Sequence, residues 1–177
     1  MDEFAKYPLY VDDDADTSLG NIRSKARCHQ MRHGLDLLIV DYLQLIEVTD
    51  KVVGENQTQR IGHISKSLKQ LARELHCPVV ALSQLSRTCE QRTDKRPIPS
   101  DLRDSGSIEQ DADKILMLYR DSEYFEDCDD PDLTELWIRK NRNGPKSCVD
   151  LNFAAQTMSF TSTDRASSDT TQSLAGT

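Results

Sequence analysis

The stretch LDLLIVDYLQLI (residues 35–46) decides the fold of this chain, because it places one aspartate in an almost unbroken apolar run. Its length and apolar continuity are typical of a strand that is buried on both faces of a parallel sheet. Asp41 directly follows the run LLIV, so its carboxylate stands at the carboxyl end of the predicted strand. From this strand alone, Asp41 could have either of two roles. An aspartate in this position caps a neighbouring helix more often than it binds a ligand.

A helix and a second strand follow this first strand. Between residues 60 and 76, apolar residues recur at steps of three and four, which predicts an amphipathic helix. CPVVALSQ (77–84) then predicts a second buried strand, and a strand–helix–strand unit makes its two strands parallel. We therefore expect Gln84 at the same edge of the sheet as Asp41, where its amide could bond a phosphate. A glutamine at a strand end is more often simply solvated.

The remaining segments predict an α/β chain. Thr17 or Ser18 and Gly34 are suited to the start and the end of a basic helix. Further strands are predicted at residues 8–13, 112–120, 133–140, 148–153 and 157–162, with a tight turn at Asn143-Gly144. From residue 163 to 177 the chain has no apolar periodicity, so we expect a disordered tail.

Composition excludes several classes of protein. The chain has 37% hydrophobic residues and no apolar run near the roughly 20 residues that span a bilayer. We therefore expect a cytosolic protein rather than a membrane protein. Five scattered cysteines predict reduced thiols rather than a zinc site or disulfides, and His29 and His33 lack a third ligand nearby. A net charge of −8 argues against a surface that coats nucleic acid, although residues 86–103 carry five basic residues against three acids.

Four segments together resemble one family. They are LLIVDYLQLI (37–46), HISKSLKQLARELHCPVVALSQLSR (63–87), RPIPSDLRDSGSIEQDADKILMLYR (96–120) and IRKNRNGP (138–145). In this order they resemble the C-terminal motor domain of DnaB-type replicative DNA helicases, from about residue 9 to about residue 161. The resemblance implies a partial RecA-like P-loop ATPase core over residues 1–162. This core would be a mostly parallel sheet flanked by helices, with a C-terminal antiparallel hairpin.

The resemblance also implies a nucleotide site for ATP and Mg²⁺. Asp41 would be the Walker B aspartate that holds Mg²⁺, and Gln84 would sense the γ-phosphate. Lys140 and Arg142 would reach the nucleotide of the neighbouring subunit, with Arg142 as an arginine finger. Without the family motif, these two residues would read as surface charges on a polar turn.

A single-stranded DNA contact is implied for the segment SDLRDSGSIEQ (100–110). Arg103, Asp104 and Gly106 would line the channel, with Arg103 on a phosphate and the small residues 105–107 allowing a close backbone approach. Asp104 stands where the family usually has glutamate, which leaves its role open, and a solvated loop is the alternative. The acidic block DSEYFEDCDDPD (121–132) is expected to be an exposed loop rather than a calcium site.

The glycine-rich loop GxxxxGK[ST] occurs nowhere in the 177 residues. We therefore expect roughly the last half of a helicase that acts as a homohexameric ring on DNA. This part would be inactive by itself and would expose a hydrophobic sheet edge for a complementary P-loop fragment. The alternative is a non-catalytic module that binds intact helicase subunits and regulates them.

Overall fold

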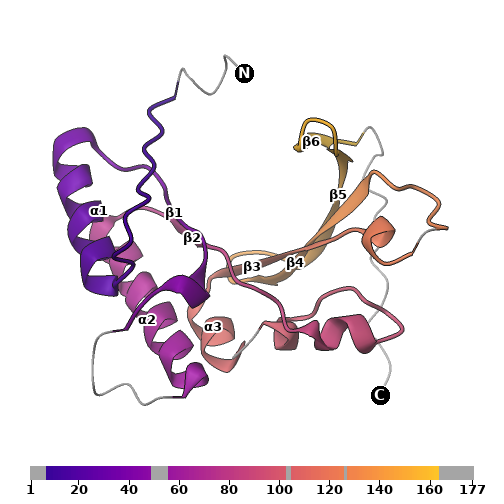
Figure 1. Ribbon diagram of the computed structural model, residues 1–177, viewed down its shortest axis with the longest axis horizontal. Helices are drawn as coiled ribbons and strands as arrows, with labels where there is room; N and C mark the ends of the chain where they lie inside the picture. The colour runs from indigo at the N-terminus through magenta and orange to yellow at the C-terminus, as the bar shows by residue number, and fades with distance from the viewer. Residues whose placement is uncertain (1–6, 49–55, 103–104, 126, 164–177) are drawn as a thin grey trace. The chain divides into compact units, whose positions relative to one another are not determined.

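The computed structural model describes residues 7–48, 56–102, 105–125 and 127–163. The chain divides into two compact units, Met1–Gln84 and Leu85–Thr177. The first unit contains two helices and a two-stranded parallel sheet, and the second contains a four-stranded antiparallel sheet (Figure 1). No helix in these ranges is long and apolar enough to cross a bilayer.

Helix α1 (Leu19–His33) has the ends that the sequence predicted. The Ser18 hydroxyl accepts a hydrogen bond from the N–H of Asn21 at 3.3 Å, which satisfies one free donor of the first turn. Gly34 ends the helix with φ of 81°, a positive value that glycine adopts without strain, and its N–H bonds Gln30 O.

Helix α2 (Gln57–Leu75) connects the two parallel strands, as predicted. Its buried side chains recur at steps of three and four along one face: Ile61, Ile64, Leu68, Leu71 and Leu75. Glu74 on α2 pairs with Arg23 and Arg27 of α1, and Gln30 donates to the carbonyl of Leu75 at 2.6 Å. The two helices of this unit are therefore joined by ion pairs as well as by apolar packing.

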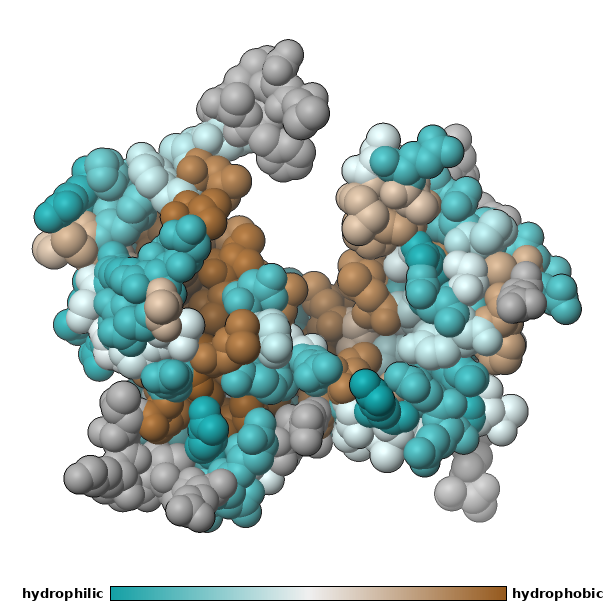
Figure 2. Space-filling view, viewed as in Figure 1, coloured by the Kyte–Doolittle hydropathy of each residue, from teal (hydrophilic) through white to brown (hydrophobic). Residues whose placement is uncertain are grey.

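Strands β1 (Leu38–Val40) and β2 (Val79–Ala81) pair in parallel, with Ile39 opposite Val80. The sequence predicted fully buried strands over 35–46 and 77–84, and this is wrong in length and in burial. Four apolar residues of one face of this pair are 43–56% exposed: Leu37, Ile39, Val80 and Leu82. Figure 2 shows hydrophobic side chains gathered over this part of the unit. Burial on both faces requires a layer on each, and the described residues leave this face uncovered.

The second unit is built on the antiparallel sheet β3–β4–β5–β6. Its strands are β3 (Lys114–Tyr119), β4 (Leu133–Asn141), β5 (Ser147–Ala154) and β6 (Ser159–Ser162). These confirm the four predicted strands of this region within one or two residues. On β3, Ile115, Met117 and Tyr119 are buried while Leu116 and Leu118 are more than half exposed. The antiparallel part is thus larger than the single hairpin expected, and the parallel part smaller.

Short helices connect the rest of this unit. They are the 3-10 turns η3 (Arg87–Gln91), η4 (Pro99–Asp101) and η5 (Asp121–Glu123), and helix α3 (Ser105–Asp111); the first unit has one such turn, η2 (Leu43–Leu45). The segment 8–13, predicted as a strand, has no regular structure. An extended segment becomes a strand only with a hydrogen-bonded neighbour, and none pairs with it among the described residues. Residues 164–177, most of the predicted disordered tail, lie outside the described residues.

Candidate functional site

Asp41 lies directly after β1, at the carboxyl end of the parallel pair. Its carboxylate is exposed and makes no hydrogen bond or ion pair within the described residues. A carboxylate without a partner at this end of a parallel strand suits Mg²⁺, which usually takes one or two protein carboxylates together with substrate phosphates. No group of three or more His, Cys, Asp or Glu side chains that could hold a metal ion occurs in the described ranges. Asp41 would therefore have to share its ion with a bound nucleotide.

Gln84 lies three residues beyond the end of β2. The prediction that it is the last residue of the strand is therefore wrong. Gln44, in the turn after Asp41, connects the two strand ends: its amide N–H donates to Ser83 Oγ at 3.1 Å, and its amide oxygen accepts from the Gln84 N–H at 3.4 Å. The side chain of Gln84 is exposed. Asp41 and Gln84 thus follow neighbouring parallel strands at the same edge, and Gln44 is a site residue that sequence reasoning missed.

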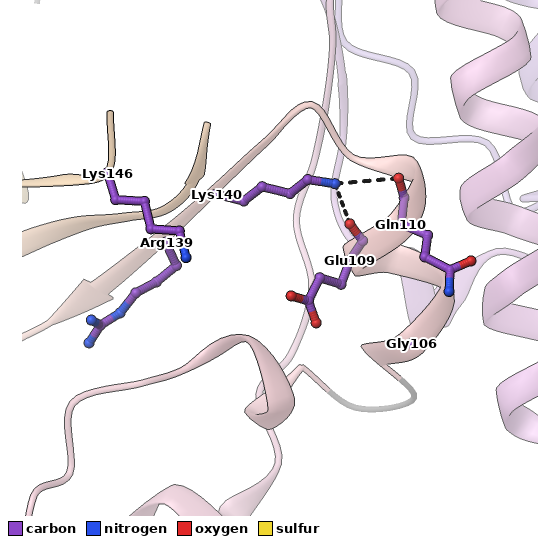
Figure 3. Close-up of a pocket in the computed structure, with 6 residues that line it drawn as sticks. All are labelled: Gly106, Glu109, Gln110, Arg139, Lys140 and Lys146. Carbon is purple, nitrogen blue, oxygen red and sulfur yellow. Dashed lines mark hydrogen bonds between the residues drawn. The ribbon is translucent and has the colours of Figure 1, made fainter. Parts of the chain in front are cut away.

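Lys140 and Arg142 lie at the end of β4 and in the following turn, in the second unit. The Lys140 ammonium donates to the carbonyls of Glu109 and Gln110, the latter at 3.3 Å, near the C-terminal end of α3 (Figure 3). Arg142 pairs with Asp113 through Nη1 at 3.1 Å, and both side chains are about half exposed. A cation at a helix C-terminus satisfies carbonyls that lack intrahelical partners. Both predicted finger residues are therefore held by contacts within their own chain.

An open pocket of about 470 Å³ lies between α3 and the β4–β5 hairpin. It is lined by Gly106, Glu109, Gln110, Arg139, Lys140 and Lys146. Three of these side chains are cationic and one is acidic, so the pocket has an excess of positive charge. Figure 3 shows Lys140 directed toward α3, whereas Arg139 leaves β4 in another direction. Gly106 is exposed, and an added Cβ would meet nothing within 4 Å.

The predicted DNA segment is only partly described. Arg103 and Asp104 lie outside the described residues, and Gly106 lies in α3 beside the pocket. Three of the five basic residues of the 86–103 segment serve internal contacts instead, among them Lys95, whose ammonium donates to Glu90 O at 3.2 Å. Arg92 bonds both oxygens of Asp101 at 2.7 and 2.6 Å, and Arg96 bonds both oxygens of Glu135 at 2.7 Å. The positive charge available to a ligand is therefore smaller than the sequence indicated.

Glu135 is the centre of a contact group that no sequence motif identified. In addition to the two hydrogen bonds from Arg96, it accepts one from Trp137 Nε1 at 2.6 Å. Hydrogen bonds with Glu135 raise the pKa of Arg96 above its usual value, so this guanidinium stays charged. Arg139 donates to the carbonyl of Pro97 at 2.9 Å, and its guanidinium lies 4.1 Å from the Trp137 ring centroid. Burial lowers the pKa of Arg139.

Comparison with known proteins assigns the family. The family model described as the DnaB-like helicase C terminal domain matches residues 1–162. The chain belongs to this family. Among curated DnaB-like relatives, the replicative DNA helicase DnaB of Geobacillus stearothermophilus is 46% identical over 165 residues, which cover 93% of this chain and 36% of that protein. DnaB of Pasteurella multocida is 49% identical over 162 residues, which cover 90% and 34%.

Solved structures of related proteins confirm the fold class. A DnaB-like replicative helicase, whose structure was described with its interactions with primase, aligns with a TM-score of 0.86 at 41% identity. The alignment covers 92% of this chain and 39% of that one. A second solved structure, described as an ATPase domain, aligns with the same TM-score and identity, covering 92% and 57%. The prediction that the chain is part of a RecA-like helicase motor domain is thereby confirmed.

The chain spans about a third of the length of the curated DnaB relatives that it matches, rather than the half expected from its motifs. The family match does not assign the roles of Asp41, Gln84, Lys140 and Arg142, or those of Arg103, Asp104 and Gly106. These roles stay predictions.

Proposed function

We propose that this chain is the distal part of an ATP-driven motor that unwinds duplex DNA as a homohexameric ring. The family match over residues 1–162 carries the proposal. The exposed carboxylate of Asp41 at the end of a parallel strand supports it. Hydrolysis of Mg²⁺-bound ATP would supply the free energy for movement along one DNA strand.

Each predicted site residue receives one task in this proposal. Asp41 holds Mg²⁺ directly or through water, and Gln84 donates its amide hydrogen bond to the γ-phosphate. Lys140 and Arg142 stabilise the charge that develops at the nucleotide of the neighbouring subunit. The half exposure of Arg142 supports this assignment, because its guanidinium can leave Asp113 at little cost.

Single-stranded DNA is the proposed ligand of the segment around Arg103, Asp104 and Gly106. The excess of positive charge in the pocket beside Gly106 supports an anionic ligand on this side of α3. Contacts to phosphates carry little sequence information, so we propose binding that is tolerant of sequence. We also propose a cytoplasmic location, by analogy with the bacterial relatives, whose chromosome lies in the cytoplasm.

We further propose that these 177 residues hydrolyse no ATP by themselves. The amides and the lysine of a P-loop supply most of the binding to the β- and γ-phosphates, and no GxxxxGK[ST] is present in this sequence. A complementary segment with that loop is the proposed partner. The uncovered apolar face of β1 and β2 supports this, because a helix that follows an added strand would pack on that face and bury it.

A chimaera tests the proposed function. The part of the Geobacillus stearothermophilus DnaB that precedes the matched region is fused to this chain, and ATP turnover is measured with and without single-stranded DNA. We expect DNA-dependent turnover from the chimaera and none from the 177 residues alone. Arg142→Ala should lower turnover by about 10³-fold. The matched control is Arg73→Ala, which removes an exposed arginine of α2 and should leave turnover unchanged.

Mixed subunits test whether Arg142 acts on the neighbouring site. Chimaeras with Asp41→Asn and with Arg142→Ala should each be nearly inactive. In a mixed ring, an intact arginine from one subunit meets an intact Asp41 site in the next, so turnover should return in part. Mixtures that stay as inactive as the separate variants would rule out action between subunits.

The second candidate is a regulatory module without catalysis, which the missing GxxxxGK[ST] favours. Such a module would bind intact helicase subunits through the face that carries Lys140 and Arg142. A pull-down with full-length helicase distinguishes the two candidates. Binding of the 177-residue chain, together with an inactive chimaera, would support the module.

A further inference from the structure

Two side chains of strand β4 bind a neighbouring loop, and a third side chain of the strand, Trp137, bonds one of them. Glu135 and Trp137 are two residues apart and share one face of the strand, and the Arg139 guanidinium lies 4.1 Å from the Trp137 ring centroid on this side. The Glu135 carboxylate accepts two hydrogen bonds from Arg96 at 2.7 Å each and one from Trp137 at 2.6 Å. Arg139 donates to Pro97 O at 2.9 Å. Two residues of the loop, 96 and 97, are therefore held by the strand.

The loop itself is closed and internally tied. Leu85 and Leu102 form an antiparallel bridge at its base, and the N–H of Ser86 donates to Asp101 O at 2.7 Å. The Asp101 carboxylate is 4% exposed and accepts two hydrogen bonds from Arg92 and one from the Ile98 N–H at 2.8 Å. Arg92 also donates to Arg96 O at 2.9 Å, so a continuous hydrogen-bond network joins Asp101, next to the loop end, to the contact with β4.

The same strand leads directly to the two finger residues. Lys140 directly follows Arg139, where the register with β3 shifts, and Arg142 follows the end of the strand. The loop leads at residue 102 into the segment of Arg103, Asp104 and Gly106. Both proposed contact regions of the second unit thus border the element that Glu135 holds together.

We propose that Glu135 is a positioning residue that couples DNA binding to ATP turnover, because it joins the loop 85–102 to strand β4 through Arg96 while Trp137 holds its carboxylate in place. This inference rests on the proposed function. Glu135 touches neither ligand. Its role is to hold the end of the loop at Leu102, which precedes the DNA segment in sequence, against the strand that carries Lys140, so that DNA binding orients the finger residues.

The test uses the chimaeric subunit with Glu135→Gln. Glutamine keeps the size of the side chain and one acceptor but loses the charge that binds both nitrogens of Arg96. We expect the stimulation of ATP turnover by single-stranded DNA to fall about tenfold. Turnover without DNA, and the affinity for an oligo-dT strand measured by fluorescence anisotropy, should stay close to those of the parent. Glu90→Gln, an exposed acid of the same loop, is the matched control and should change none of these quantities.

Two further variants make the result specific. Arg96→Lys keeps the positive charge but loses the two-pronged contact, so it should reduce stimulation in the same way. Glu135→Asp keeps the carboxylate and should restore part of the stimulation. If Glu135→Gln does not fold, as judged by circular dichroism, Arg96→Lys gives the deciding measurement.

The outcomes separate the two proposals. A folded Glu135→Gln with full stimulation by DNA overturns the role of Glu135. A variant that loses DNA affinity and DNA-independent turnover to the same extent also overturns it, because that pattern indicates a general structural role. If the parent chimaera shows no stimulation, or if Arg142→Ala leaves it unchanged, the proposed function fails, and the coupling fails with it.

Discussion

Arg142 and Asp113 are joined twice: Nη1 of Arg142 lies 3.1 Å from Oδ1 of Asp113, and the Arg142 N–H donates to the Asp113 carbonyl at 2.9 Å. The backbone bond fixes the position of the arginine, whereas the side-chain pair is about half exposed and exchanges readily with water. The predicted finger is therefore held in place but free to turn toward another anion.

This relationship predicts a small effect of Asp113→Asn on stability. Because both charges are exposed and screened, the free energy of unfolding should change by less than about 1 kcal/mol. Urea denaturation of the parent and the variant measures the difference. The backbone hydrogen bond remains in the variant and serves as an internal control. A loss several times larger would mean that the ion pair supports the hairpin.

Asp101→Asn should destabilise the chain much more, by about 3 kcal/mol, because it leaves Arg92 without its buried counter-charge. Burial raises the pKa of Asp101, but the hydrogen bonds from Arg92 and the Ile98 N–H outweigh it, so the pKa lies below its usual value. The carboxylate therefore stabilises the fold at neutral pH, and this contribution is lost as pH falls through the lowered pKa.

Urea denaturation at several pH values checks the role of Asp101. The difference between parent and Asp101→Asn should be constant above about pH 5 and shrink below about pH 4, where the unfolded chain takes up the proton. Asp94→Asn, an exposed acid of the same loop, is the control and should cost little. A difference that persists unchanged at acidic pH would contradict the charged Asp101–Arg92 pair.

Cys148 should react slowly with alkylating reagents. Burial raises the pKa of its thiol to about 11, and only the thiolate is nucleophilic. At pH 8 the folded protein should alkylate at Cys148 about two orders of magnitude more slowly than the same chain in urea. Mass spectrometry of the Cys148 peptide with iodoacetamide measures both rates. Because the folded pKa is raised, this shift stabilises the fold below the unfolded pKa, and the contribution is lost as pH rises toward 11.

Truncation of Ile64 on α2 should lower the stability of the first unit strongly. This residue is 1% exposed, and Ile64→Ala should cost about 3 kcal/mol through lost burial and a cavity. Lys66→Ala on the exposed side of the same helix should change stability little. Thermal unfolding followed by circular dichroism compares the two. Equal effects would mean that the predicted apolar face does not form the core.

Elements with local signals could be predicted from the sequence. Ser18 and Gly34 bound α1 because capping depends on side chains within a few residues. The apolar spacing of α2 and the alternation around β4 and β5 depend equally on local order. Burial of β1 and β2 could not be predicted, because it depends on which layers cover Ile39 and Val80, and the described residues cover only part of them.

The position of Asp41 at the carboxyl end of β1 was predictable, because it depends on one apolar run, whereas its role stays a prediction. Longer-range partners were not predictable. Arg96 reads as a free basic residue in the sequence, yet Glu135, 39 positions away, holds it. Gln44 lies in the quoted segment 37–46 but received no role, because its partner Ser83 is 39 positions away. Pairing between distant residues depends on the fold, and the charges that remain for a ligand are known only after those pairs are identified.

The uncovered face of β1 and β2 has a consequence for the newly made chain. The first unit ends at Gln84, so the parallel pair can form while later residues are still being synthesised. If these 177 residues are made without a covering segment, Leu37, Ile39, Val80 and Leu82 face water as soon as the unit folds. A chaperone that holds apolar surfaces would bind there, and the lifetime of the chain in the cell would depend on how soon a permanent cover replaces it.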